Sequence, residues 1–189
     1  MTTLIAKDEG LLPTFAATAL WVALIAALCV GGSFAYACAA PLAAISALAA
    51  IKMGRSDGVV LVTIAWLANQ AVGYGLLDYP QTANSFAWGG AIGVAAIAGF
   101  YATRSVLVIG LPRIATLCAA LVAAFAAYEI ILYATGLVLG SSVSAYSPAV
   151  VGRIFAINAV SFLGLLLLHR IAVAIALLRP VEDGTPASV

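Results

Sequence analysis

Long apolar runs separated by short polar stretches make up most of this chain. A helix needs about 20 mostly apolar residues to cross the hydrocarbon core of a bilayer, where it satisfies its own backbone hydrogen bonds. The first run, from Pro13 to Met53, is too long for one such helix, and the small residues Gly31 to Ser33 supply a natural break. The pattern predicts six helices, at residues 13–31, 36–53, 58–77, 85–103, 113–137 and 149–169, the last with an apolar continuation to residue 178.

Basic residues are distributed unevenly between the two sides of this predicted bundle. Arg153 is alone on one side, and the other side collects Lys7, Lys52, Arg55, Arg104, Arg113, Arg170 and Arg179. Short cytoplasmic loops retain Lys and Arg, so we expect both termini in the cytoplasm. The predicted fold is an all-α integral membrane protein of about six transmembrane helices. It has a cytoplasmic segment over 1–12, a transmembrane domain over 13–179 and a disordered cytoplasmic tail over 180–189.

Composition agrees with this pattern. Of the 189 residues, 65% are hydrophobic and only 8% are charged, and the mean hydropathy is +1.18, values outside the range of soluble globular domains. We therefore expect a multi-pass protein of the cell inner (plasma) membrane, with the lipid bilayer as its main surroundings. The net charge of +1 offers no clustered basic face, and a nucleic-acid partner is not expected.

Polar side chains within the predicted helices are the main functional signal, because such groups are costly in hydrocarbon. Two helices carry them at spacings of three, four, seven or eight, which place them on one face of each helix. These residues are Trp66, Asn69, Gln70, Gly73 and Tyr74 in the third helix, and Phe125, Glu129 and Tyr133 in the fifth. At about 1.5 Å per residue, Asn69 and Glu129 lie about 18 Å and about 24 Å from the cytoplasmic helix ends. Both positions fall in the outer half of the membrane.

The same outer side receives polar and aromatic residues from loops and helix ends. They are Asp78, Tyr79, Gln81, Asn84, Trp88, Tyr146, Arg153 and Asn158. Such a set predicts an outward-facing pocket for a small, partly aromatic or heterocyclic solute. The candidate binding residues are Trp66, Asn69, Gln70, Tyr74, Tyr79, Trp88, Glu129, Tyr133, Arg153 and Asn158.

Within this predicted pocket, Glu129 is suited to accept a hydrogen bond or pair with a cation, and Arg153 to hold a carboxylate or phosphate. A structural interpretation stands beside this one. Tyrosine and tryptophan form interfacial belts, and Asn or Gln often bridges neighbouring helices. Glu129 and Arg153 are also a pair that can neutralise each other.

The residue types needed for catalysis or metal binding are sparse. The single histidine, His169, stands beside Arg170 at the predicted cytoplasmic end, where both side chains can snorkel to the interface. The three cysteines, Cys29, Cys38 and Cys118, lack the spacing of a zinc or redox motif and are typical of apolar packing. Neither catalytic residues, nor a metal, nor a cofactor is predicted, and we expect that the protein is not an enzyme.

Small residues recur at every fourth position in several predicted helices. Examples are Ala19, Ala23 and Ala27, then Ala39, Ala43 and Ala47, and then Ala87, Ala91, Ala95 and Gly99. Such stripes allow helix backbones to approach closely, either within the bundle or against a separate membrane subunit.

Six helices in under 200 residues, cytoplasmic termini, the stripe of Ala19, Ala23 and Ala27 and an outward polar site together resemble the substrate-binding S component of an energy-coupling-factor (ECF) vitamin transporter. The resemblance implies a vitamin or vitamin-precursor binder, with Ala19, Ala23 and Ala27 docking a transmembrane coupling subunit that two ATPases drive. Two other interpretations remain open at this stage. One is a self-sufficient secondary transporter or channel, and the other is an accessory or assembly subunit of a membrane complex.

Overall fold

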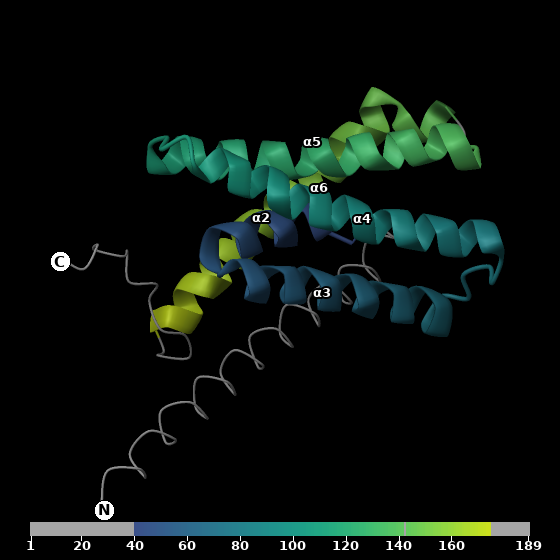
Figure 1. Cartoon of the computed structure of the whole chain (residues 1–189), viewed down its shortest axis with the longest axis horizontal. Helices are drawn as coiled ribbons and strands as arrows, with labels where there is room; N and C mark the ends of the chain where they lie inside the picture. The colour runs from purple at the N-terminus through teal and green to yellow at the C-terminus, as the bar shows by residue number, and fades with distance from the viewer. Residues whose placement is uncertain (1–39, 142, 175–189) are drawn as a thin grey trace, which may run out of the picture.

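The computed structural model describes residues 40–141 and 143–174, and this part of the chain is a bundle of α-helices without strands (Figure 1). The elements are α2 (Leu42–Lys52), α3 (Arg55–Leu76), α4 (Ala83–Leu107), α5 (Arg113–Leu139), the 3-10 turn η1 (Val143–Tyr146) and α6 (Pro148–Ala174). The helices predicted at 58–77, 85–103, 113–137 and 149–169 are confirmed as α3 to α6. The predicted first helix, the terminal segments 1–12 and 180–189, and Ala19, Ala23 and Ala27 lie outside the described residues.

Four of these helices have the length and composition of membrane spans. α3, α4, α5 and α6 contain 22, 25, 27 and 27 residues, or about 33 to 40 Å each, compared with a hydrocarbon core of about 30 Å. Each has an apolar stretch with at most two charged residues. The sequence and the described helices together indicate a multi-pass membrane protein.

α2 is shorter than predicted. We expected a helix over 36–53, whereas residues 40 and 41 are not helical and α2 starts at Leu42. The reason is Pro41, which cannot donate a backbone hydrogen bond and disfavours helical geometry in the residue before it. The eleven residues of α2 extend about 16 Å, roughly half the thickness of the hydrocarbon core.

The short helix α2 forms the centre of the described bundle. Every residue from Leu42 to Ala50 is buried, and α2 packs against α3, α4, α5 and α6. Figure 1 shows it in the half of the bundle that also contains the start of α5 and the end of α6. A helix that is apolar all round is typical of such an enclosed position, and Ala43 and Ala47 of the predicted small stripe serve this internal packing.

Small side chains bring α4 close to its neighbours. A Cβ atom on Gly99 would lie 3.0 Å from the carbonyl oxygen of Ala124 in α5, so this crossing depends on glycine. The Thr103 hydroxyl donates to the carbonyl of Ala120 at 3.1 Å. On the other side of α4, the buried Ser46 hydroxyl of α2 makes contacts of 2.8 Å with the carbonyls of both Leu42 and Ala96. These polar contacts hold α2, α4 and α5 in a fixed arrangement.

Candidate functional site

The polar stripe of α3 faces α4. The Trp66 indole Nε1 donates to the carbonyl oxygen of Gly89 at 2.8 Å, and the Gln70 side chain lies so close to Gly89 that a Cβ there would be 2.5 Å from its Oε1. Tyr74 and Ser85 share a hydrogen bond of 3.1 Å between their hydroxyl groups. Three of the predicted binding residues therefore form part of the α3–α4 interface.

Tyr79 closes this interface at the end where α3 stops and α4 begins. After α3, Asp78 adopts a left-handed conformation with φ of 51°, which reverses the chain, and the Tyr79 amide donates to the Gly73 carbonyl at 3.0 Å. The Tyr79 ring then packs edge-on against Tyr74, with ring centroids 5.8 Å apart, and Tyr74 stacks on Phe86 at 4.8 Å. We call Trp66, Gln70, Tyr74 and Tyr79 the α3–α4 group, whereas Trp88 of α4 is half-buried without a described contact to α3.

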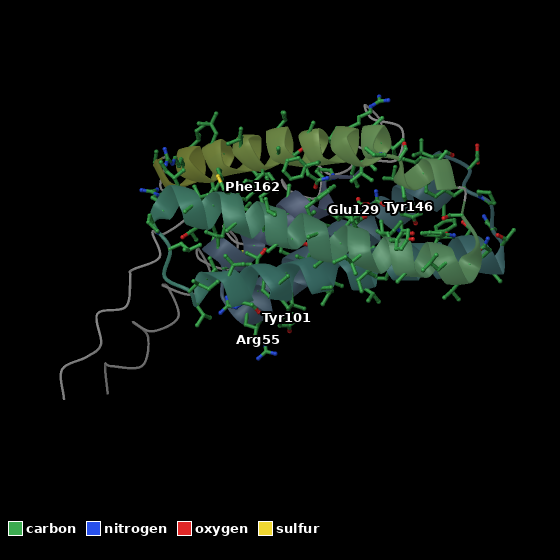
Figure 2. All side chains as sticks on the ribbon, turned by 90° about the horizontal axis from the view of Figure 1, so that it is seen from above. Arg55, Tyr101, Glu129, Tyr146 and Phe162 are labelled. Atoms are coloured by element: carbon green, nitrogen blue, oxygen red, sulfur yellow. The ribbon has the colours of Figure 1, made fainter. Side chains whose placement is uncertain are left out.

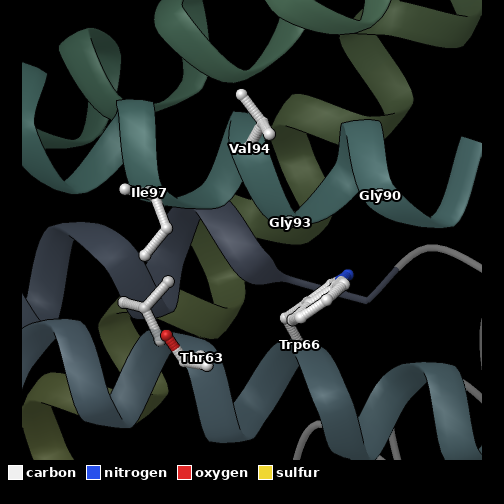
Figure 3. A pocket seen from close by; sticks show the side chains of 7 residues that line it. Thr63, Trp66, Gly90, Gly93, Val94 and Ile97 are labelled. Carbon is white, nitrogen blue, oxygen red and sulfur yellow. The ribbon is translucent and has the colours of Figure 1, made fainter. Parts of the chain in front are cut away.

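A pocket of about 300 Å³ lies beside Trp66 between α3 and α4 (Figure 3). Apart from the Thr63 hydroxyl and the Trp66 indole, its walls are aliphatic side chains and glycines, such as Val94 and Gly93. It has no charged residue in its lining. The Trp66 N–H is already bonded to the Gly89 carbonyl, so the Thr63 hydroxyl is the one side-chain polar group that this lining offers to a solute.

Asn69 lies on the buried face of α3, whereas Trp66, Gln70 and Tyr74 are half-buried. It is 7% exposed and shares the buried face of α3 with Leu61 and Ala65. Its Oδ1 accepts a hydrogen bond of 3.4 Å from Gln70 Nε2. α2 ends at Lys52 and α3 starts at Arg55, so the lengths of both helices can be measured from this basic end of the bundle. Asn69 lies about 21 Å along α3 from that end, whereas α2 extends only about 15 Å from it. The amide of Asn69 therefore lies beyond the start of α2.

Asn158 of α6 caps the start of α2. Its Oδ1 accepts from the backbone N–H of Ala44 at 3.0 Å, and its Nδ2 donates to the Ile154 carbonyl at 3.0 Å. Asn158 is 2% exposed. The first amides of a helix have no partner within the helix, so a side chain from another element supplies one here. This contact holds the start of α2 against α6.

Glu129 lies on the side of α5 that faces α6 and η1 (Figure 2). One turn before it, the Phe125 ring meets Phe155 of α6 at 5.1 Å, and one turn after it, Tyr133 meets Tyr146 of η1 at 5.2 Å. The half-buried Glu129 carboxylate makes no hydrogen bond or ion pair with any described residue. We call Glu129, Tyr133 and Tyr146 the Glu129 group.

Arg153 joins neither group. It is exposed on α6, whereas Phe155, Asn158 and Phe162 occupy the partly or fully buried face of that helix. The chain as described contains no ion pair between Arg153 and Glu129, so the suggested mutual neutralisation is not observed.

The two groups lie on different sides of the bundle centre. α3 packs against α2 and α4, and α5 packs against α4, α2 and α6. The contacts described above for the α3 stripe are with α4, and those for the α5 stripe are with α6 and η1. None of these contacts joins the two stripes, as a shared pocket would require. Sequence reasoning also missed Ser46 and Ser85, because an isolated serine in a helix gives no signal of its partner.

The described residues contain no group of three His, Cys, Asp or Glu side chains that could hold a metal ion. No protein-family model, curated protein or solved structure matches this chain. Its function is therefore argued from the geometry of the bundle.

Proposed function

We propose that this chain is a membrane-embedded solute-binding subunit of an uptake transporter, with its site in the outer half of the bundle. In this proposal the chain crosses the cell inner (plasma) membrane six times, with both termini in the cytoplasm. The Glu129 group forms the site, and α2 forms its floor. The α3–α4 group supports one wall through helix packing.

The observation that carries this proposal is the difference between the two halves of the bundle. The half with the basic helix ends is filled by α2, whose residues Leu42 to Ala50 are buried. Asn158 lies at the start of α2, and Asn69 and Glu129 lie beyond it along their helices. A channel requires a polar path through both halves, whereas a binding subunit requires a polar recess on one side only.

The residues of this site define the kind of solute that it suits. A half-buried carboxylate without a partner among the described residues favours a cation or a strong hydrogen-bond donor. The rings of Tyr133 and Tyr146, which meet edge-on beside Glu129, favour a flat ring. We therefore infer a small heterocyclic solute, vitamin-like in size, that carries a donor or a positive charge.

Transport requires a source of energy, for which we propose a partner. In the resemblance to ECF S components, a transmembrane coupling subunit with ATPases supplies that energy and docks on Ala19, Ala23 and Ala27. The chain itself would not catalyse a reaction or carry a cofactor.

The test is native mass spectrometry of the detergent-purified protein, comparing the wild type with Glu129→Gln. We expect a retained small molecule in the wild type and at least tenfold less in the variant, because a hydrogen bond to a charged group contributes about 1.5–3 kcal/mol. Asp57→Asn, which removes an exposed carboxylate from the first turn of α3, should retain the solute. Equal retention in all three proteins, or an empty wild type, would contradict the proposal, and an empty wild type with stoichiometric membrane partners would indicate an accessory subunit.

A self-sufficient secondary transporter is the second candidate, and α2 favours it. Secondary transporters often use helices that start near the membrane midplane, where their first amides face the site. The two candidates differ in what the chain does alone. Uptake by proteoliposomes that contain only this chain and an ion gradient would indicate a secondary transporter, whereas binding without uptake would indicate a subunit.

A further inference from the structure

Three basic side chains surround a pocket of about 290 Å³ at one end of the bundle. Lys52 is the last residue of α2, Arg113 is the first residue of α5, and Arg170 lies in the last two turns of α6. Four leucines of α5 and α6 complete the lining. Elements far apart in the sequence thus place three positive charges beside an apolar wall.

The lining of this pocket contains neither Asp nor Glu. Among the described residues, no hydrogen bond or ion pair involves the guanidinium of Arg113 or of Arg170, and both side chains are exposed. The start of α5 adds to the positive potential. Thr116 is the residue whose N–H bonds to the carbonyl of Pro112, so the amides before it have no partner within the helix and attract anions.

The leucines determine which anion fits. Leu163 and Leu167 are 66% and 60% exposed, and they lie on the membrane-spanning part of α6, next to the charged rim. A free ion uses only the rim, whereas an amphiphile with a phosphate head and an acyl tail uses the rim and the leucines together. Basic pockets between transmembrane helices are typical binding sites for anionic lipid headgroups.

We propose that this pocket binds an anionic phospholipid of the leaflet at this end of the bundle. The phosphate lies between Lys52, Arg113 and Arg170, where the arginines can hold its oxygens in bidentate contacts. The first carbons of an acyl chain lie along Leu163 and Leu167. A volume of about 290 Å³ is close to the lower limit of about 300 Å³ for small-molecule pockets, and it suits a headgroup with the start of its tail.

This inference is independent of the proposed solute site. It uses no residue of the Glu129 group, and it holds for a binding subunit, a transporter or an assembly factor alike. Lys52, Arg113 and Arg170 also belong to the basic side of the predicted topology, where the cytoplasmic leaflet supplies anionic lipids.

The experiment is native mass spectrometry of the full chain from nanodiscs that contain equal amounts of phosphatidylglycerol and phosphatidylcholine. We expect a preference for the anionic lipid of at least tenfold in the wild type. Arg113→Gln and Arg170→Gln should each reduce retention of that lipid about fivefold, and the triple variant with Lys52→Gln about 100-fold. Arg55→Gln is the matched control, because Arg55 is an exposed cation at the same end of the bundle whose contacts are with Tyr101, outside the pocket.

Four outcomes would overturn the proposal. Equal retention of the two lipids in the wild type would exclude a specific anionic site. The same loss in Arg55→Gln as in Arg113→Gln would reduce the effect to overall charge. Full displacement of the lipid by millimolar inorganic phosphate would identify a site for a free anion. Displacement of the lipid by a peptide of residues 175–189, which contains Glu182 and Asp183, would identify this chain's own tail as the occupant. Because Arg113 and Arg170 are exposed, their single variants should fold and keep the test valid if the triple variant does not.

Discussion

Replacing Asn158 with alanine tests the contact that fixes the start of α2 inside the bundle. The side chain is 2% exposed, and it is the cap of the Ala44 amide. Pro41, three residues before Ala44, has no backbone N–H. The N–H of Ala44 is therefore one of the few backbone donors at the start of α2. In Asn158→Ala, the donor loses its partner in a place where the surrounding residues of α2 are buried.

The expected effect follows from two magnitudes. Leaving a buried donor without a partner costs about 1–3 kcal/mol, and removing a side-chain N-cap costs about 0.5–2 kcal/mol. The variant should therefore lose about 1–2 kcal/mol of unfolding free energy, since part of the donor's need can be met by relaxation of the helix. Asn158→Asp keeps the acceptor oxygen and should recover the capping contact, although its charge adds a burial penalty.

The assay is reversible unfolding in mixed micelles by titration with SDS, followed by the loss of helical circular dichroism. Asn84→Ala serves as the control, because Asn84 is exposed in the first turn of α4. The reasoning about α2 is refuted if Asn158→Ala unfolds within about 0.5 kcal/mol of the wild type, the usual range of neutral surface substitutions.

Two further substitutions test the packing around α4 with the same assay. Gly99→Ala places a Cβ at 3.0 Å from the Ala124 carbonyl, whereas Gly90→Ala meets nothing within 4 Å. Both gain helix propensity equally, so Gly99→Ala should be less stable than Gly90→Ala by about 1–3 kcal/mol, and equal stabilities would contradict the close approach of α4 and α5. Trp66→Phe removes the donor to the Gly89 carbonyl and should reduce the unfolding free energy by about 0.5–1.5 kcal/mol, whereas no loss would mean that the indole contributes nothing to the α3–α4 interface.

The helices could be predicted from the sequence where long apolar runs end at charged residues. The predicted helices at 113–137 and 149–169 start within one residue of α5 and α6, because Arg113 and Pro148 mark clear starts. α2 shows what hydropathy misses. The alanines on both sides of Pro41 suggested continuous helix, and the backbone limits of proline ended it at Leu42 instead.

The candidate site could be predicted only in part, because periodicity identifies which side chains share a helix face but not which helix that face packs against. The spacing correctly grouped Trp66, Gln70 and Tyr74, and the structure places them against α4. The position of α2 and α4 between α3 and α5 depends on small residues such as Gly99, and this tertiary packing leaves no periodic signal along α3. The basic pocket was likewise invisible, since Lys52, Arg113 and Arg170 are far apart in the sequence and served only as topology markers.

Sided cysteine labelling at position 129 tests most directly whether the bundle is open on its outer side and closed by α2 on the inner side. The background variant has Cys29, Cys38 and Cys118 replaced by serine, and Arg55→Cys, at an exposed position, reports the side that the topology predicts to be cytoplasmic. The account predicts that Glu129→Cys reacts with a membrane-impermeant maleimide from the outside alone, while Arg55→Cys reacts from the inside alone. Labelling of position 129 from the inside, or from neither side, would contradict an outward-facing site with α2 as its floor.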